Sequence, residues 1–240
     1  MLLYIFYIFL GILPTLVWLL FYLKKDAHPE PKIMVFKIFL LGFLMALPAI
    51  LIELGLTNAF NLLKEINFPD NLILFLNLFI AVALVEEVLK YLVVHEKVLR
   101  SPDFDEPIDA VIYLIIAGLG FAAAENILIL ASLGNNFSWT TLFNLTLLRF
   151  WGAIFLHALC SGLLGYFLAL ACTKIKRKNF YLISGLSLVT ILHGLFNLFI
   201  MKLEENNLYL IPNILILSGL ALFLSLAIKR LKKLKSICQI

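Results

Sequence analysis

Long apolar runs separated by short polar segments dominate the pattern of this chain. A helix needs about 20 mostly apolar residues to cross the roughly 30 Å of hydrocarbon in a bilayer. Seven runs meet that length, which predicts an all-α, polytopic membrane bundle of about seven transmembrane helices. The fifth run is so long that its inner turn is expected to protrude. The predicted spans are Leu2–Leu23, Ile33–Leu56, Asn71–Val94, Ile108–Leu133, Thr141–Cys172, Phe180–Met201 and Leu208–Ile228.

Lysine and arginine gather in alternate loops, which predicts the orientation of the bundle. Fifteen of the 19 follow spans one, three, five and seven, whereas the other loops hold only Lys64 and Lys202. The N-terminus is therefore expected outside and the C-terminus in the cytoplasm. The first run lacks a basic start and a small-residue cleavage site, so we interpret it as an uncleaved span. The basic tail, residues 229–240, is expected to be an inside anchor, with binding of anionic membrane lipid as the alternative.

The composition agrees with a membrane protein and excludes other classes. Hydrophobic residues make up 63% of the chain and charged residues 14%, against about 45–50% and about 25% in soluble domains. A soluble enzyme, a disordered chain and a disulfide-stapled domain are therefore excluded. The basic residues border apolar runs, so no nucleic-acid partner is expected. We expect one transmembrane domain over residues 1–240, in which Cys160 and Cys172 are packing residues and Cys238 has no pairing motif.

Ionisable and amide side chains inside the apolar runs need a reason, because one charge at the bilayer centre costs at least about 2.5–3.5 kcal/mol. Span two carries only Glu53, and spans one and seven carry no charge. The remaining groups lie in spans three to six, which can form one bundle. They are Glu86, Glu87, Lys90, Glu125, Asn126, Arg149, His157, His193 and Asn197.

Helical spacing predicts which of these side chains share a face. Glu86 and Glu87 are adjacent, about 100° apart, so we expect one to face the histidines and the other to pair with Lys90, without a common target. Three pairs are four or eight residues apart and therefore co-facial: Phe121–Glu125, Arg149–His157 and His193–Asn197.

Depth can be estimated from the rise of about 1.5 Å per residue. Glu125, His157, His193 and Asn197 come out roughly 19–26 Å above the inner ends, near or beyond the midplane. Glu86 reaches a similar depth only if the third helix continues through His95 to Arg100, which we expect.

Structural roles are the alternative for individual residues. Glu86–Lys90 could be a buried ion pair, and Asn126 or Asn197 could hydrogen-bond between helices. Two carboxylate sites and two histidines on four neighbouring helices instead favour a functional cluster. The acids of the loop before span four are interpreted as a helix start behind Pro107, and the small residues before Glu125 as a close helix contact. Those acids are Asp103, Asp105, Glu106 and Asp109, and the small residues are Gly118, Gly120, Ala122, Ala123 and Ala124.

The cluster offers the groups that hydrolysis of a peptide bond by water requires. A carboxylate in an apolar cavity is a general base near neutral pH, and two histidines with a glutamate could instead hold Zn²⁺. The sequence contains no HExxH or GxSxG motif, so a zincin helix and a serine-hydrolase elbow are excluded.

Several motifs, in order, resemble the PrsW-type intramembrane proteases of the CAAX-protease and bacteriocin-processing superfamily. The resemblance covers about residues 82–201. The motifs are EEVLK at Glu86–Lys90, FDEPIDA at Phe104–Ala110, GFAAAEN at Gly120–Asn126, the segment His157–Leu159 and HGLFN at His193–Asn197.

The resemblance implies catalytic roles for Glu86 and Glu87, with Glu86 as the base. It also implies that His193 and Asn197 hold a metal or stabilise the oxyanion, and that His157 is the family's additional histidine. The wider superfamily has FxxxH where this chain has Phe121 and Glu125, as the PrsW branch does. The metal ligands that the resemblance implies, around Zn²⁺, are Glu87, Glu125, His157 and His193. If the enzyme is instead of the glutamic type, no cofactor is implied. The supporting residues implied are Lys90, Phe121, Glu125, Asn126 and Arg149.

PrsW-type proteins resemble site-one proteases that cut single-span anti-sigma factors on the extracytoplasmic side. This implies an intramembrane endopeptidase in the membrane of a bacterium or the archaeal equivalent. Asn135, Asn136 and Ser138 are expected to border the entrance. A proton- or cation-coupled transporter with a Glu/His relay is the alternative function, and a non-catalytic scaffold leaves the buried charges unexplained.

Overall fold

A computed structural model describes residues 2–26, 28–134 and 138–234, and every regular element in these ranges is helical. Seven helical stretches are long and apolar enough to cross a membrane, which confirms the predicted count. The third stretch combines α3, a π-helical segment over Leu76–Leu84 and α4. The main helices are α1 (Leu2–Leu23), α2 (Lys32–Asn61), α3 (Asp70–Phe75), α4 (Val85–Lys97), α5 (Asp109–Ser132), α6 (Trp139–Trp151), α7 (Ala153–Thr173), α8 (Lys178–Lys202) and α9 (Leu210–Leu231).

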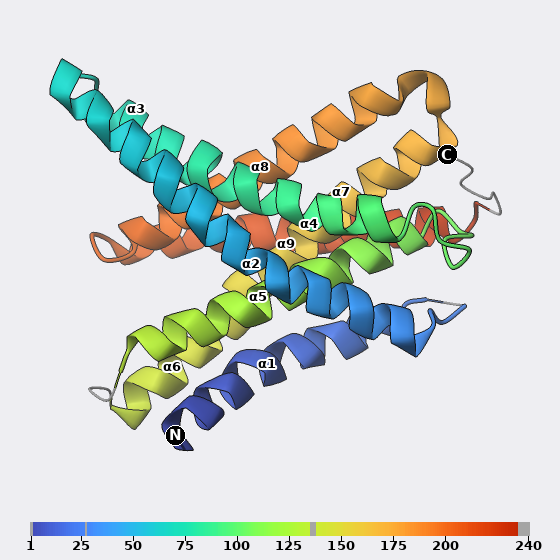
Figure 1. Cartoon of the computed structure of the whole chain (residues 1–240), viewed down its shortest axis with the longest axis horizontal. Helices are drawn as coiled ribbons and strands as arrows, with labels where there is room; N and C mark the ends of the chain where they lie inside the picture. The colour runs from blue at the N-terminus through green and yellow to red at the C-terminus, as the bar shows by residue number, and fades with distance from the viewer. Residues whose placement is uncertain (1, 27, 135–137, 235–240) are drawn as a thin grey trace.

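Helix α5 is the centre of the bundle, where α1, α2 and α7 surround it (Figure 1). Its residues are buried almost without interruption from Asp109 to Ala124. A methyl group on Gly120 would overlap the carbonyl oxygen of Phe39 in α2, so the two backbones are in contact. This confirms the predicted role of the small residues before Glu125, since packing of close backbones replaces the hydrophobic effect inside a bilayer.

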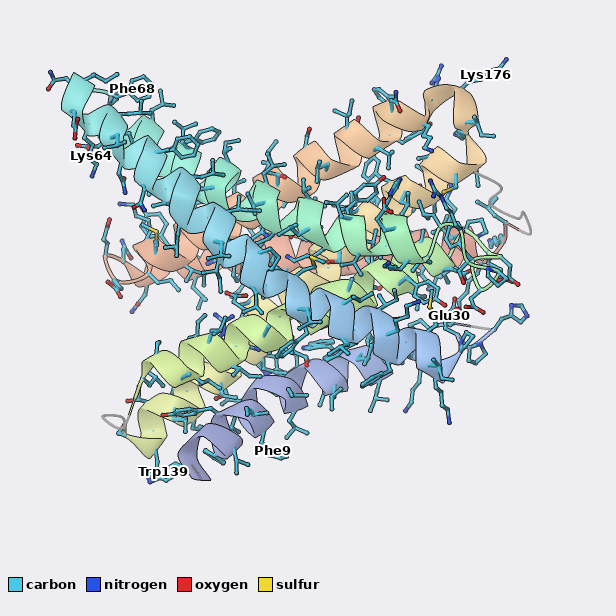
Figure 2. All side chains as sticks on the ribbon, viewed as in Figure 1. Phe9, Glu30, Lys64, Phe68, Trp139 and Lys176 are labelled. Atoms are coloured by element: carbon cyan, nitrogen blue, oxygen red, sulfur yellow. The ribbon has the colours of Figure 1, made fainter. Side chains whose placement is uncertain are left out.

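The helices cross near the middle of the molecule and diverge toward its ends, so that the end of α2 where the chain turns into α3 lies apart from the ends of α1, α5 and α6 (Figure 1). Glu30 and Lys176 lie at one end, and Lys64, Phe68 and Trp139 lie at the other (Figure 2). The loops after spans one and five therefore share an end, as a seven-span topology requires.

Two helix ends differ from the predicted boundaries. Span two was expected to end at Leu56, but α2 runs to Asn61 and a 3₁₀ turn continues to Ile66. A run of hydropathy marks the hydrocarbon, whereas a helix continues as long as its backbone hydrogen bonds do. Span three was expected to reach Arg100, but α4 ends at Lys97, where the chain enters a turn in which the Ser101 amide donates to the Val98 carbonyl at 2.8 Å.

The predicted fifth span is broken into two helices at Gly152. Helix α6 ends at Trp151 and α7 begins at Ala153, with Gly152 at φ −103° and ψ −92° between them. A Cβ atom on Gly152 would lie 2.7 Å from the carbonyl oxygen of Leu148. Any larger residue would clash there, so the backbone conformation at the break requires glycine. Hydropathy did not show it, because both halves are apolar.

The acidic loop before α5 forms a helix start, as predicted. Asp109 accepts hydrogen bonds from the amides of Asp105 at 3.0 Å and Glu106 at 2.7 Å. Tyr113, one turn later, donates to Glu30 in the loop between α1 and α2 at 2.5 Å. These contacts attach the first connecting loop to the central helix.

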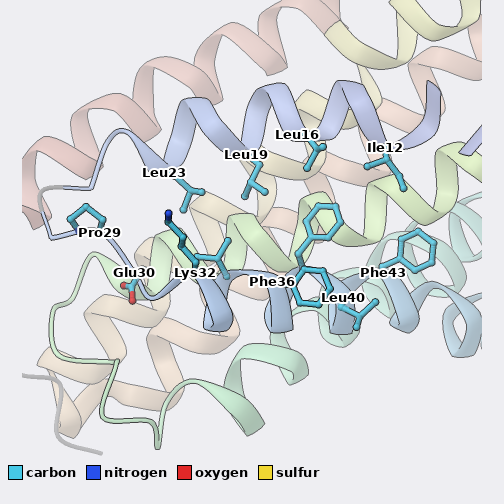
Figure 3. Close-up of a pocket in the computed structure, with 12 residues that line it drawn as sticks. Ile12, Leu16, Leu19, Leu23, Pro29, Glu30, Lys32, Phe36, Leu40 and Phe43 are labelled. Carbon is cyan, nitrogen blue, oxygen red and sulfur yellow. The ribbon is translucent and has the colours of Figure 1, made fainter. Parts of the chain in front are cut away.

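An apolar cavity of about 620 Å³ lies between α1 and α2, with Glu30 and Lys32 at one end (Figure 3). None of its lining residues belongs to the polar cluster of the middle spans. The cysteines Cys160 and Cys172 are both buried, which agrees with a packing role. Asn135, Asn136, Lys235 and Cys238 lie outside the described residues.

Candidate active site

Six of the nine polar residues predicted from spans three to six line one cavity of about 500 Å³. Its walls are formed by the third to the seventh span, and most of them are apolar. Glu125 and Arg149 line it beside the histidines, whereas Glu87 and Lys90 lie behind its wall and are fully buried. The polar lining residues named by the sequence are Glu86, Glu125, Arg149, His157, His193 and Asn197.

The π-helical segment and α8 lie in contact directly before the carboxylates of α4. A methyl group on Gly194 would overlap the ring of Phe79 in that segment. Such segments interrupt α-helices frequently at functional sites. The close contact brings His193, the neighbour of Gly194, within reach of the start of α4.

Lys90 connects both carboxylates of α4 to α7. Its Nζ atom donates to Glu86 Oε2 at 3.0 Å, to Glu87 Oε1 at 2.8 Å and to His157 Nδ1 at 2.8 Å. The prediction that the two glutamates have no common target is wrong. Positions three and four residues before a lysine both face it, and its long side chain reaches between them.

The Glu87 carboxylate holds the ring of His193. Glu87 Oε1 lies 2.9 Å from His193 Nδ1, and both side chains are buried. A carboxylate has only acceptors, so Nδ1 carries the proton and Nε2 keeps a free lone pair. That Nε2 atom faces Glu86, whose Oε2 lies 3.9 Å away.

His157 has the opposite arrangement of its ring nitrogens. The Lys90 ammonium has only donors, so His157 Nδ1 accepts and Nε2 carries the proton. The Nε2–H group donates to Glu125 Oε2 at 2.8 Å. Glu86 Oε2 lies 3.8 Å from His157 Nδ1, which completes a triangle with His193.

Arg149 joins α6 to α5 beside the histidine. Its Nη2 atom lies 3.2 Å from Glu125 Oε1, and its Nε group donates to Asn126 Oδ1. Arg149 and His157 thus reach the same carboxylate, as their predicted co-facial spacing suggested, although a helix break lies between them. Phe121 lies under Lys90, with 4.7 Å between Nζ and the ring centroid.

Glu86, His157 and His193 could hold a metal ion together. One ligand atom from each lies within 4.8 Å of the others, and all three residues are buried. Two histidines and one glutamate are a donor set of catalytic zinc sites, and the Glu87–His193 bond is the kind of outer contact that orients a ligating histidine. The residues therefore fit a metal, although Lys90 shares His157 Nδ1. Of the ligands named from sequence, Glu87 and Glu125 bond to the far nitrogens of the two rings instead.

Sequence reasoning missed one polar residue of the cavity. Asn213 in α9 lines it and is 2% exposed. The other spans of the site were recognised by the charged residues inside them, and span seven has no charged residue inside it. A neutral amide inside an apolar run was the available signal. Ser138, expected at the entrance, caps α6 by accepting from the Thr141 amide at 3.0 Å and does not line the cavity.

A family profile described as "PrsW family intramembrane metalloprotease" matches residues 30–226. The chain belongs to this family. The match extends the expected 82–201 core on both sides and confirms the resemblance read from the motifs. The chain is therefore a peptidase and a multi-pass membrane protein that acts on a membrane-protein substrate.

Curated relatives of the PrsW family cover most of the chain. A protein named Protease PrsW from Oceanobacillus iheyensis is 30% identical over 213 residues, 89% of this chain and 91% of the relative. Proteins of the same name are 30% identical in Geobacillus kaustophilus, over 79% and 77% of the two chains, and 28% identical in Bacillus subtilis, over 84% and 86%. The comparison with solved structures gave no significant match. The transporter alternative receives no support.

Proposed function

We propose that the chain cleaves a single-span membrane protein by water activated at Glu86, His157 and His193. The observation that carries the proposal is the triangle of their ligand atoms, all within 4.8 Å at the wall of a mostly apolar cavity. Because most of the cavity wall is apolar, electrostatic interactions inside it are stronger than at a protein surface.

Zinc is the metal we propose for this donor set. When bound, it would lower the pKa of a coordinated water to about 7 and polarise the scissile carbonyl. His193 would ligate through Nε2, since Glu87 holds its other nitrogen. His157 would ligate through Nδ1, for which the Lys90 ammonium must give up one of its three contacts.

The remaining residues have supporting roles in the proposal. Lys90 offsets the charge of two buried carboxylates. Glu125 fixes His157 and is itself held by Arg149. Asn197 lines the cavity four residues after His193, where its amide can donate to the developing oxyanion.

The substrate we propose is a single-span anti-sigma-factor-like protein, cut toward the outer side of a bacterial or archaeal cytoplasmic membrane. The distribution of lysine and arginine supports the orientation, with the N-terminus outside. We also propose that residues 1–240 act as one transmembrane domain, since α5 packs against helices that precede and follow it.

Purified protein in lipid nanodiscs, with single-span anti-sigma factors encoded in the same genome, tests the proposal. The wild type and the exposed control Glu204→Gln are expected to cleave the substrate. Glu86→Gln and His193→Ala are expected to reduce the cleavage rate at least about a hundredfold. Full cleavage by the last two variants contradicts the site. Chelation is expected to abolish cleavage and zinc to restore it. Undiminished cleavage by rigorously metal-free protein rejects the metal and leaves Glu86 as a general base.

A further inference from the structure

We infer that Asn213 binds the unwound backbone of the substrate and positions it beside the scissile bond. The inference rests on the proposed function, and it adds a polar residue of α9 to a site whose other polar residues come from the third to the sixth span. It assigns to that residue a peptide group as its ligand.

Asn213 is a buried amide without an internal partner. It is 2% exposed, and neither its Oδ1 nor its Nδ2 atom has a hydrogen-bond partner among the described residues. The same side chain lines the cavity that contains Glu86, His157 and His193. Its neighbours on the cavity wall in α9 are Leu210, Ile214 and Leu217, all apolar.

Such an amide is unfavourable in the resting protein. A buried polar group that makes no hydrogen bond loses its interaction with water and gains nothing in return. Asparagine in membrane helices normally bonds across to another helix. The side chain of Asn213 lines the cavity and bonds to no other helix among the described residues. Its partner is therefore expected to be a molecule that enters the cavity.

The chemistry of the side chain indicates which molecule that is. A carboxamide offers a donor and an acceptor side by side and carries no charge, which matches the N–H and C=O groups of a peptide. A transmembrane substrate must unwind before water can reach its scissile bond, and its backbone groups then lose their partners in hydrocarbon. Asn213 can replace one lost pair. The apolar tails of lipids offer no such groups.

The position of Asn213 suggests how far it lies from the scissile bond. It is three residues from the start of α9, whereas His193 is nine residues from the end of α8. The two helices are joined at that end through Asn207–Tyr209. The rise of a helix then gives a difference in depth of on the order of 9 Å, about three residues of extended chain.

The first experiment compares Asn213→Leu with Asn144→Leu, the same change on the exposed face of α6. With the anti-sigma factor that the wild type cleaves, Asn213→Leu is expected to raise KM about tenfold with kcat changed less than about twofold. Its melting temperature is expected to stay or rise, because leucine has the same branching as asparagine and removes an unpaired amide. The control is expected to change neither constant.

An unchanged KM for Asn213→Leu overturns the inference. A loss of cleavage that is fully explained by a lower melting temperature of the variant overturns it as well. If the leucine variant does not fold, Asn213→Ala provides the test, with the same tenfold rise expected because alanine can neither donate nor accept a side-chain hydrogen bond. Failure of the proposed function is distinct, since the wild type itself would then cleave none of the anti-sigma factors.

A second experiment locates the contact on the substrate. Synthetic single-span peptides of the cleaved anti-sigma factor carry one ester in place of an amide at successive positions around the scissile bond. The wild type is expected to lose about tenfold in kcat/KM at one position, about three residues away, where an N–H group is missing. Asn213→Leu is expected to show no loss specific to that position. An equal position-specific loss in both proteins overturns the assignment to Asn213.

Discussion

Glu87 Oε1 lies 2.9 Å from His193 Nδ1, and the contact joins residues that are 106 positions apart. It leaves Nε2 of His193 as the nitrogen that faces Glu86. Glu87 therefore lies behind the cavity wall and contacts His193, whereas Glu86 lines the cavity itself. The two adjacent glutamates have different positions in the site although the sequence presents them as a pair.

Glu87→Gln is expected to weaken metal binding about 10–100-fold, because an outer carboxylate raises the basicity of the histidine that it holds. Glutamine can still accept from Nδ1–H, so the fold should persist. Competition with a chelating dye measures the affinity, and saturating zinc is expected to recover most of the cleavage. Wild-type affinity in Glu87→Gln would show that the carboxylate only fills space.

Lys90→Met is expected to destabilise the protein by about 3–5 kcal/mol, because it leaves two buried carboxylates without their counter-charge. Lys90 is fully buried, with Glu86 at 3.0 Å and Glu87 at 2.8 Å. Unfolding in mixed micelles measures the change, and adding Glu87→Gln is expected to recover part of it. The control is Lys202→Met, which breaks an exposed pair with Glu205 and is expected to have no measurable effect. Equal stability of the two lysine variants would contradict the buried ion pair.

Gly120→Ala is expected to cost about 1–3 kcal/mol, since its methyl group would push α5 away from the backbone of Phe39 in α2. Gly55→Ala is the matched control, because nothing lies within 4 Å of a Cβ atom there. The midpoint of thermal unfolding in nanodiscs compares them. If both alanine variants melt at the same temperature, α2 and α5 are not in backbone contact.

Glu30 is expected to make the stability of the protein depend on pH. Burial raises the pKa of Glu30 to about 8. The hydrogen bond from Tyr113 lowers this pKa, and the nearby charge of Asp109 raises it, but burial is the largest cause. An unfolded glutamate titrates near 4.3. The folded state therefore binds more protons between about pH 4.3 and 8, so its stability falls as the pH rises through this window.

Glu30→Gln is expected to flatten that pH dependence, because glutamine accepts from Tyr113 and does not ionise. Unfolding midpoints measured from pH 5 to 8.5 give the slope for each protein. The exposed control Glu204→Gln is expected to keep the wild-type slope. An identical slope in Glu30→Gln would mean that Glu30 is already ionised at pH 5 in the folded protein.

The seven spans could be predicted because bilayer thickness acts on each apolar run separately. The ends of α2 and α4 could not be predicted to the residue, since a helix does not stop where the hydrocarbon does. The break at Gly152 was also hidden, because it depends on the backbone of Leu148 and on no change in hydropathy.

The site could be predicted as a set of residues. Glu86, His157 and His193 are costly in hydrocarbon, so their presence alone indicated function. Their partners could not be derived in the same way. That Lys90 contacts both glutamates and His157 depends on rotamers and on how α4 crosses α7.

The sequence by itself determined the helical membrane fold, the resemblance to the PrsW family and the ionisable residues of the site, because hydropathy and charge are local properties of the chain. Only the tertiary structure decided which nitrogen of each histidine faces the cavity, and only it brought Asn213 to the cavity wall. These are relationships between helices distant in sequence. They depend on the packing of whole helices, which no single segment encodes.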